Sequence, residues 1–196
     1  MKSSFKIDIP DDVIQKIYTR VKEYPWHEMP DDGGWSYGTN LEYMKELCDY
    51  WINKFNWRVQ ERKINKFNHY TSFVNDINIH FIHEKGSGSS PLPLLISHGW
   101  PGSIVEFLKI IDPLAHPEKY AGNIEDAFDV IVPSLPGFGF SDRPSRPIGP
   151  RKIAKYFDLL MTDSLGYTRY LAQGGDWGGA ISSWLGFEHT ACQAIH

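Results

Sequence analysis

Three short apolar runs that alternate with helix-like segments limit the fold of this chain more than any other feature. The runs cover residues 92–97, 127–133 and, more weakly, 167–173. The helix-like segments cover residues 104–114, 151–165 and 177–187. Short continuous apolar runs predict strands buried on both faces, which is typical of a mostly parallel sheet covered by helices on each side. We therefore expect an α/β fold.

The first third of the chain has a helical pattern instead. Apolar residues recur at helical spacing in segments 13–21 and 41–55, and a shorter helix is expected at 57–66. Thr39 to Glu42 fit a capping box for the second of these helices. Alternating residues on both sides of Asn75-Asp76 then predict a hairpin. The expected organisation is a helical extension at residues 1–68 and an α/β core at residues 69–196.

Composition excludes several classes of function. The net charge of −4, with scattered basic residues, gives no basis for binding nucleic acid. Two cysteines, Cys48 and Cys192, are too few for a disulfide framework or a zinc site, so we expect no metal and no cofactor. No apolar segment reads as a signal peptide or membrane anchor, and we expect a cytoplasmic protein. Composition does not predict the oligomeric state.

The stretch QGGDWGG, residues 173–179, places a carboxylate at a very tight turn between a strand and a helix. One interpretation is that Asp176 only caps the helix, since aspartate is a favoured N-cap residue. The other follows from the pattern Gly174-x-Asp176-x-Gly178, which matches a nucleophile elbow with Asp in place of Ser. The glycines suit this second interpretation because small neighbours let strand and helix approach closely.

A second loop supports the elbow. His98-Gly99-Trp100-Pro101 directly follows the first buried run. In elbow folds one oxyanion donor is the amide after the nucleophile, here Trp177, and the other comes from a His-Gly loop of this kind. The simpler alternative is that the loop only turns the chain.

Together these motifs resemble those of the α/β-hydrolase epoxide hydrolases of the microsomal and juvenile-hormone type, which carry an N-terminal helical extension. The matching stretches are HGWPGS (98–103), PSLPGFGFSDRP (133–144), GGDWGG (174–179) and, nearer the start, LEYMKELCDYW (41–51). The resemblance extends over nearly the whole chain and implies a small apolar epoxide as substrate.

The resemblance also implies a role for each matched residue. Asp176 would be the nucleophile that forms an alkyl-enzyme ester, and the Trp100 and Trp177 amides would form the oxyanion hole. Trp100, Phe138 and Phe140 are candidates for the substrate pocket or, equally, for core packing. The residues that support the motifs without a chemical role are His98, Gly99, Pro101, Gly174, Gly175, Gly178 and Gly179.

The sequence lacks parts that the family would supply after the elbow helix. Lid tyrosines, a late acid and its histidine have no counterpart, and we expect an N-terminal fragment, incomplete and inactive in turnover. Two alternatives remain open. A haloalkane dehalogenase-like hydrolase shares the DWGG stretch, although its loop usually has a polar residue where Trp100 stands. A non-catalytic remnant or binding module would keep only an apolar cleft.

Overall fold

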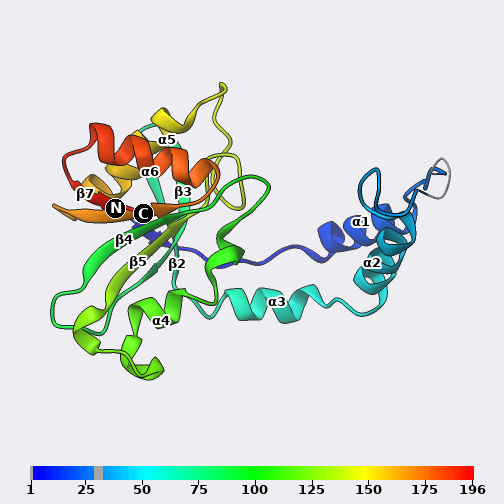
Figure 1. The fold of residues 1–196 in the computed structure, drawn as a ribbon, viewed down its shortest axis with the longest axis horizontal. Coiled ribbons are helices and arrows are strands. Elements are labelled where there is room, and N and C mark those ends of the chain that lie inside the picture. The colour runs from blue at the N-terminus through cyan, green and yellow to red at the C-terminus, as the bar shows by residue number, and fades with distance from the viewer. Residues whose placement is uncertain (1, 29–32) are drawn as a thin grey trace. The chain divides into compact units, whose positions relative to one another are not determined.

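The computed structural model describes residues 2–28 and 33–196 and divides the chain into two compact units (Figure 1). Met1–Lys6 and Ile64–His196 form one unit, here called the sheet unit. Ile7–Lys63 form the other, the helical unit. This division differs from the boundary expected at residue 68, because strand β1 (Lys2–Ser4) joins the sheet.

The sheet unit contains a seven-stranded mixed sheet with the order β1-β2-β3-β5-β4-β6-β7. Its strands after β1 are β2 (His69–Val74), β3 (Ile77–Glu84), β4 (Leu92–Ser97), β5 (Phe128–Pro133), β6 (Tyr170–Gly174) and β7 (Cys192–Ile195). β2 and β3 form the expected hairpin, and β3 pairs antiparallel with β5. The pairs β5–β4, β4–β6 and β6–β7 are parallel, which confirms the predicted fold class.

Helices cover both faces of this sheet. α5 (Pro150–Leu159) and α6 (Trp177–Glu188) lie on one face in Figure 1, and α4 (Ile111–Ala115) lies on the other. The core beneath α5 and α6 is apolar, and its fully buried members include Phe81, Leu95, Ile131, Phe157, Leu160, Ile181 and Leu185. Burying each such side chain contributes about 1.5–3 kcal/mol, so this interface fixes the start of α6 against the sheet.

Two expected helices differ from the structure. Residues 104–114 form a 3₁₀ turn, Ile104–Phe107, followed by the separate short helix α4. Pro113 explains the break, because proline fits only the first turn of a helix. Residues 151–165 form α5 and then a π-helical turn, Leu160–Ser164.

The helical unit consists of α1 (Asp11–Lys22), α2 (Leu41–Asn53) and α3 (Trp57–Ile64). The expected capping box is corrected: Asn40, not Thr39, is the N-cap of α2, and its Oδ1 accepts a hydrogen bond of 2.9 Å from the Tyr43 amide. Asn is as good a cap as Thr, so both positions satisfy the local rule.

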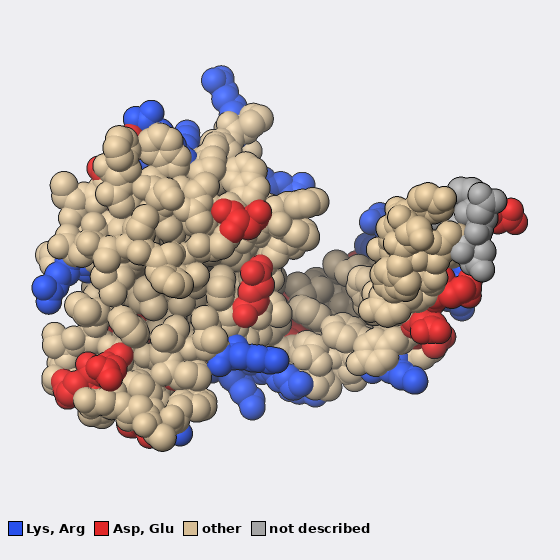
Figure 2. All heavy atoms as spheres, viewed as in Figure 1, with Lys and Arg blue, Asp and Glu red and all other residues tan. Residues whose placement is uncertain are grey.

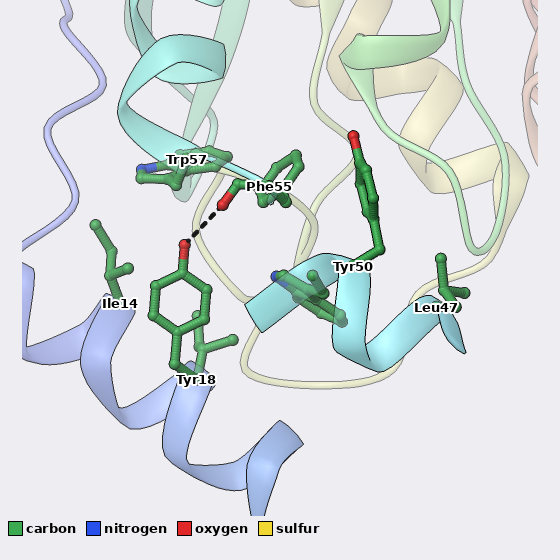
Figure 3. Close-up of a pocket in the computed structure, with 8 residues that line it drawn as sticks. Ile14, Tyr18, Leu47, Tyr50, Phe55 and Trp57 are labelled. Carbon is green, nitrogen blue, oxygen red and sulfur yellow. Dashed lines mark hydrogen bonds between the residues drawn. The ribbon is translucent and has the colours of Figure 1, made fainter. Parts of the chain in front are cut away.

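No residue of α1 or α2 is fully buried. Their apolar faces instead line a pocket of about 390 Å³, shown in Figure 3. Its walls are aliphatic and aromatic, and within it the Tyr18 hydroxyl donates to the Phe55 carbonyl at 3.2 Å. The lining holds no acid, histidine, cysteine or serine, so this pocket offers no carboxylate, imidazole, thiol or serine hydroxyl for catalysis.

Candidate functional site

The sharp turn between β6 and α6 is the centre of the candidate site. Asp176 has φ 54° and ψ −123°, a conformation that residues other than glycine rarely adopt. Such a strained backbone costs on the order of 1–3 kcal/mol and persists only where the surrounding structure imposes it. Asp176 occupies the N-cap position of α6, but its side chain makes no cap hydrogen bond, so capping does not explain why an aspartate stands there.

Two glycines make this turn possible. A Cβ on Gly174 would lie 2.3 Å from the carbonyl atoms of Gly178. A Cβ on Gly178 would lie 2.0 Å from the Ser97 carbonyl oxygen at the end of β4. The other two glycines of the motif are less constrained: a Cβ on Gly175 would meet nothing within 4 Å, and one on Gly179 would be 3.3 Å from the nearest atom.

The carboxylate of Asp176 faces the loop after β4. Its Oδ1 accepts a hydrogen bond of 2.8 Å from the Trp100 amide. The backbone amides of Trp177 and then of Trp100 lower the pKa of the Asp176 carboxyl below its usual value. Amides that stabilise the ionised form act in this way, so the group is a carboxylate at neutral pH.

Glycine is also required in the facing loop. A Cβ on Gly99 would lie 2.3 Å from Asp176 Oδ1, so no larger residue allows this approach. The Trp100–Pro101 peptide is cis, and the Gly102 amide closes the turn by donating to the Gly99 carbonyl at 2.9 Å. The structure thus brings together the two motifs that the sequence paired.

His98 is buried and braces this loop. Its Nε2 accepts from the Leu135 amide at 3.1 Å, and its Nδ1 lies 2.9 Å from the Gly99 carbonyl oxygen. A carbonyl can only accept, so Nδ1 carries the proton and the ring is neutral. Burial lowers the pKa of His98, which agrees with this state. Both nitrogens are occupied by structural bonds.

An apolar pocket of about 430 Å³ lies beside the carboxylate. Trp100 and Phe138 line it, together with Leu135, Pro136, Pro144, Ile148, Ile153 and Trp177. The expectation for Phe140 is corrected: its ring packs against Phe5 and His80, at centroid distances of 5.4 and 5.1 Å. Gly139, with φ 51°, separates the two phenylalanines.

The ring hydrogen bonds of the described histidines go to groups other than Asp176. The ring nitrogens of His69, His80 and His83 all have hydrogen-bond partners among themselves or on Ile64, Ser134, Lys2 and Tyr167. His189, which follows α6, pairs with Asp158 at 3.1 Å. In residues 2–28 and 33–196, no cluster of three or more His, Cys, Asp or Glu residues could hold a metal ion.

Several structural parts of the site have no sequence motif of their own. The Leu135 amide ties the pocket to His98, the Ser97 carbonyl lies against Gly178, and Ile148 and Ile153 complete the pocket wall. All are long-range contacts made by ordinary residues. Only the position of Ser97, at the end of an apolar run before His98, could have suggested its place.

Figure 2 shows a face on which acidic and basic residues are scattered among uncharged ones. Within the described part of the chain, no helix combines the length and hydrophobicity that crossing a membrane needs.

Comparisons with known proteins identify the family. The family model for the epoxide hydrolase N terminus matches residues 2–107, and that for the alpha/beta hydrolase fold matches residues 93–192. A putative epoxide hydrolase of Stigmatella aurantiaca is 41% identical over 182 residues, which cover 92% of this chain and 41% of that protein. Epoxide hydrolase 1 of Sus scrofa is 38% identical over 182 residues, covering 90% and 40% respectively.

A solved structure shares the fold. The structure of Aspergillus niger epoxide hydrolase matches with a TM-score of 0.90 and 30% sequence identity, covering 100% of this chain and 51% of that one. The chain spans about two fifths of the length of the curated relatives it matches. The family model for the epoxide hydrolase N terminus covers more than half of the residues, and the Aspergillus niger epoxide hydrolase shares the fold. We conclude that this chain belongs to the epoxide hydrolase family.

Proposed function

We propose that a protein carrying this chain hydrolyses apolar epoxides to vicinal diols, with Asp176 as the nucleophile. The observation that carries this proposal is the Asp176 carboxylate, held at a positive-φ corner with Oδ1 2.8 Å from the Trp100 amide. A carboxylate that is already ionised needs no general base to attack a carbon atom.

In the first step a carboxylate oxygen of Asp176 attacks one epoxide carbon. The new bond is an ester C–O bond, the ring C–O bond breaks, and its electron pair stays on the ring oxygen, which takes a proton from an acid or from water. The Trp100 amide holds Oδ1, which leaves Oδ2 as the attacking atom. The constrained backbone keeps the carboxylate in place and so reduces the entropy lost in reaching the reactive geometry.

In the second step water adds to the ester carbon of Asp176. The negative charge that develops on the carboxyl oxygen falls where the Trp100 amide, and beside it the Trp177 amide, can donate hydrogen bonds. The acyl C–O bond between Cγ and the ester oxygen then breaks, and its electron pair leaves with that oxygen. The oxygen takes up a proton given up by the attacking water and departs in the diol, while the water oxygen stays in the restored carboxylate. Losing one such donor costs about 10²–10³ in rate in comparable oxyanion holes.

The neighbouring pocket supports an apolar substrate. Its lining consists of aliphatic, proline and aromatic side chains with no charged residue. Exposed indoles of Trp100 and Trp177 lie on this wall, with 67% and 43% of their surface accessible. Apolar walls with few convergent polar groups are typical of sites for small apolar ligands.

Intact-mass analysis after incubation with styrene oxide tests the proposal. We expect one covalent adduct per chain, mapped to Asp176 by peptide mass, and none in Asp176→Asn. Asp8→Asn, a change at another exposed aspartate, is the matched control and should react like the wild type. The ester should persist in this chain, because no described histidine contacts Asp176 to activate water. No adduct would favour the binding-module alternative, and repeated turnover to diol would contradict the argument for persistence.

The dehalogenase alternative has less support. Trp100 provides a bulky indole where a halide-binding loop would present a polar side chain, and the matching family model is that of the epoxide hydrolases. A halide-release assay with a haloalkane should therefore give no product.

The cellular location is also part of the proposal. Cys48 and Cys192 are both free thiols, which suits a reducing compartment such as the cytoplasm. Cell fractionation with an antibody to the chain tests this.

A further inference from the structure

A buried histidine in the middle of β3 is hydrogen-bonded to the segment that lines the pocket, although the proposed chemistry does not use it. His80 is 0% exposed, and both of its ring nitrogens have partners. Nε2 lies 3.0 Å from His69 Nδ1, and Nδ1 lies 2.9 Å from Ser134 Oγ. No acidic side chain takes part in these contacts.

The direction of this hydrogen-bond chain follows from its end. His69 Nε2 lies 2.9 Å from the Ile64 carbonyl oxygen, which can only accept, so Nε2 of His69 carries a proton. In the neutral ring His69 Nδ1 then accepts from His80 Nε2, and His80 Nδ1 accepts from the Ser134 hydroxyl. Burial, with the neighbouring His69, lowers the pKa of His80 to about 3, so the ring stays neutral at physiological pH.

The backbone of His80 binds the same segment. Its carbonyl accepts from the Ser134 amide at 2.8 Å, and its amide donates to Ser141 Oγ at 2.9 Å. Ser141 Oγ in turn donates to the Ser134 carbonyl at 2.8 Å. Both ends of residues 134–141, here called the pocket loop, are therefore hydrogen-bonded to a single residue of β3, His80.

The pocket loop forms one wall of the candidate site. Leu135, Pro136 and Phe138 line the pocket beside Asp176. The Leu135 amide also donates to His98, which connects this wall to the loop that carries the Trp100 amide. A small movement at Ser134 would thus change the distance between the apolar wall and the carboxylate.

We propose that His80 is a positioning residue, which holds the pocket loop through Ser134 and Ser141 and so sets the wall on which the apolar part of the epoxide rests. This inference rests on the proposed function. It assigns His80 no contact with substrate. It predicts that breaking the hydrogen-bond chain from His69 through His80 to Ser134 slows the reaction with bulky epoxides selectively. If the role of His80 were purely structural, the reaction with all epoxides would be slowed alike.

Ser134→Ala tests this, because it removes the hydroxyl and leaves His80 Nδ1 without its donor. Initial rates of adduct formation are measured by intact mass with styrene oxide and with ethylene oxide, which has no apolar substituent. We expect a loss of about tenfold with styrene oxide, the rate equivalent of about one net hydrogen bond, and a change of less than about twofold with ethylene oxide.

Ser72→Ala is the matched control. Ser72 is a buried serine of the adjacent strand β2, and its hydroxyl has no hydrogen-bond partner among the residues that the structure describes. This variant should keep both rates within about twofold of the wild type. Equal losses on both epoxides in Ser134→Ala, or no loss on either, would overturn the proposal.

A pair of variants at His80 separates the two ends of the chain. Asn places an oxygen near the position of Nδ1 and can still accept from Ser134, whereas Gln places its amide near Nε2 and can still donate to His69. We expect His80→Asn to keep more of the preference for styrene oxide than His80→Gln. The opposite order would contradict the proposed role.

The proton positions give a measurement that needs no reaction. Two-bond ¹H–¹⁵N correlation spectra of the wild-type chain should show His80 and His69 protonated on Nε2 and His98 protonated on Nδ1. A His80 protonated on Nδ1 would overturn the inference and leave the proposed function standing. Absence of any adduct in the wild type would refute the proposed function, whatever the spectra show.

Discussion

Replacing Gly178 by alanine tests whether the close contact between β4 and α6 is what holds the turn at Asp176. The added Cβ would lie 2.0 Å from the Ser97 carbonyl oxygen, whereas ordinary contact begins at 3.4 Å. Strand or helix must therefore move by roughly 1.4 Å, the difference between these distances. Both atoms of the clash belong to or are attached to backbone, so no side-chain rotation relieves it.

The expected loss of stability can be bounded. Overpacking of this kind costs about 1–3 kcal/mol, and occasionally more. Alanine is better than glycine inside a helix by about 1 kcal/mol, which offsets part of the cost in the first turn of α6. We expect Gly178→Ala to lower the free energy of unfolding by about 1–2 kcal/mol and to slow adduct formation at Asp176, because the turn moves away from Trp100.

Urea unfolding followed by tryptophan fluorescence measures the first effect, and intact mass with styrene oxide measures the second. Gly175→Ala is the matched control: its Cβ would meet nothing within 4 Å, and its φ does not lie in the left-handed region. This variant should be as stable as the wild type or more stable by up to about 1 kcal/mol. Wild-type stability and wild-type reactivity in Gly178→Ala would refute the reasoning.

Three further predictions concern the carboxylate and the buried histidines. Gly99→Ala, whose Cβ would lie 2.3 Å from Asp176 Oδ1, should abolish adduct formation by intact mass, and full reactivity would show that the loop is not required. Because amides lower the pKa of Asp176, adduct formation should not decline between pH 8 and about pH 5, and a loss centred on neutral pH would contradict this. Burial lowers the pKa of His80 to about 3 and of His83 to about 4, whereas unfolding restores values near 6.5. The unfolded chain then binds more protons, so urea titrations should show a free energy of unfolding about 2 kcal/mol lower per histidine at pH 5 than at pH 7. A free energy of unfolding that does not change between these pH values would contradict the neutral state of the two buried histidines.

The parts of the fold that the sequence predicted well are those with a strong local signal. The run at 92–97 coincides with β4, and the elbow turn falls where glycines surround Asp176. Apolar runs and glycine positions report directly on burial and backbone conformation, so both could be read without a structure. The Trp100 amide could also be placed, because two motifs, each at the end of a parallel strand, meet at one edge of the sheet.

The parts that sequence could not predict depend on partners far along the chain. β1 joins the sheet through Ser72 and its neighbours, although three residues near the terminus carry no strand pattern. His80 lies in a predicted strand, but its bonds to Ser134 and Ser141 join residues more than fifty positions apart. Phe138 lines the pocket whereas Phe140 packs against Phe5 and His80. The backbone at Gly139 turns between them, and the sequence does not specify its conformation.

The backbone at Asp176 also bears on how such a site can be lost. An L-residue at φ 54° strains the polypeptide, and glycine would relieve that strain at the same place. Substitution by glycine would therefore make the chain more stable and chemically inert in one event. At position 176 the residue that the reaction needs is therefore less favourable for stability than glycine. Where catalysis is no longer selected for, we expect substitution toward the more stable, unreactive form.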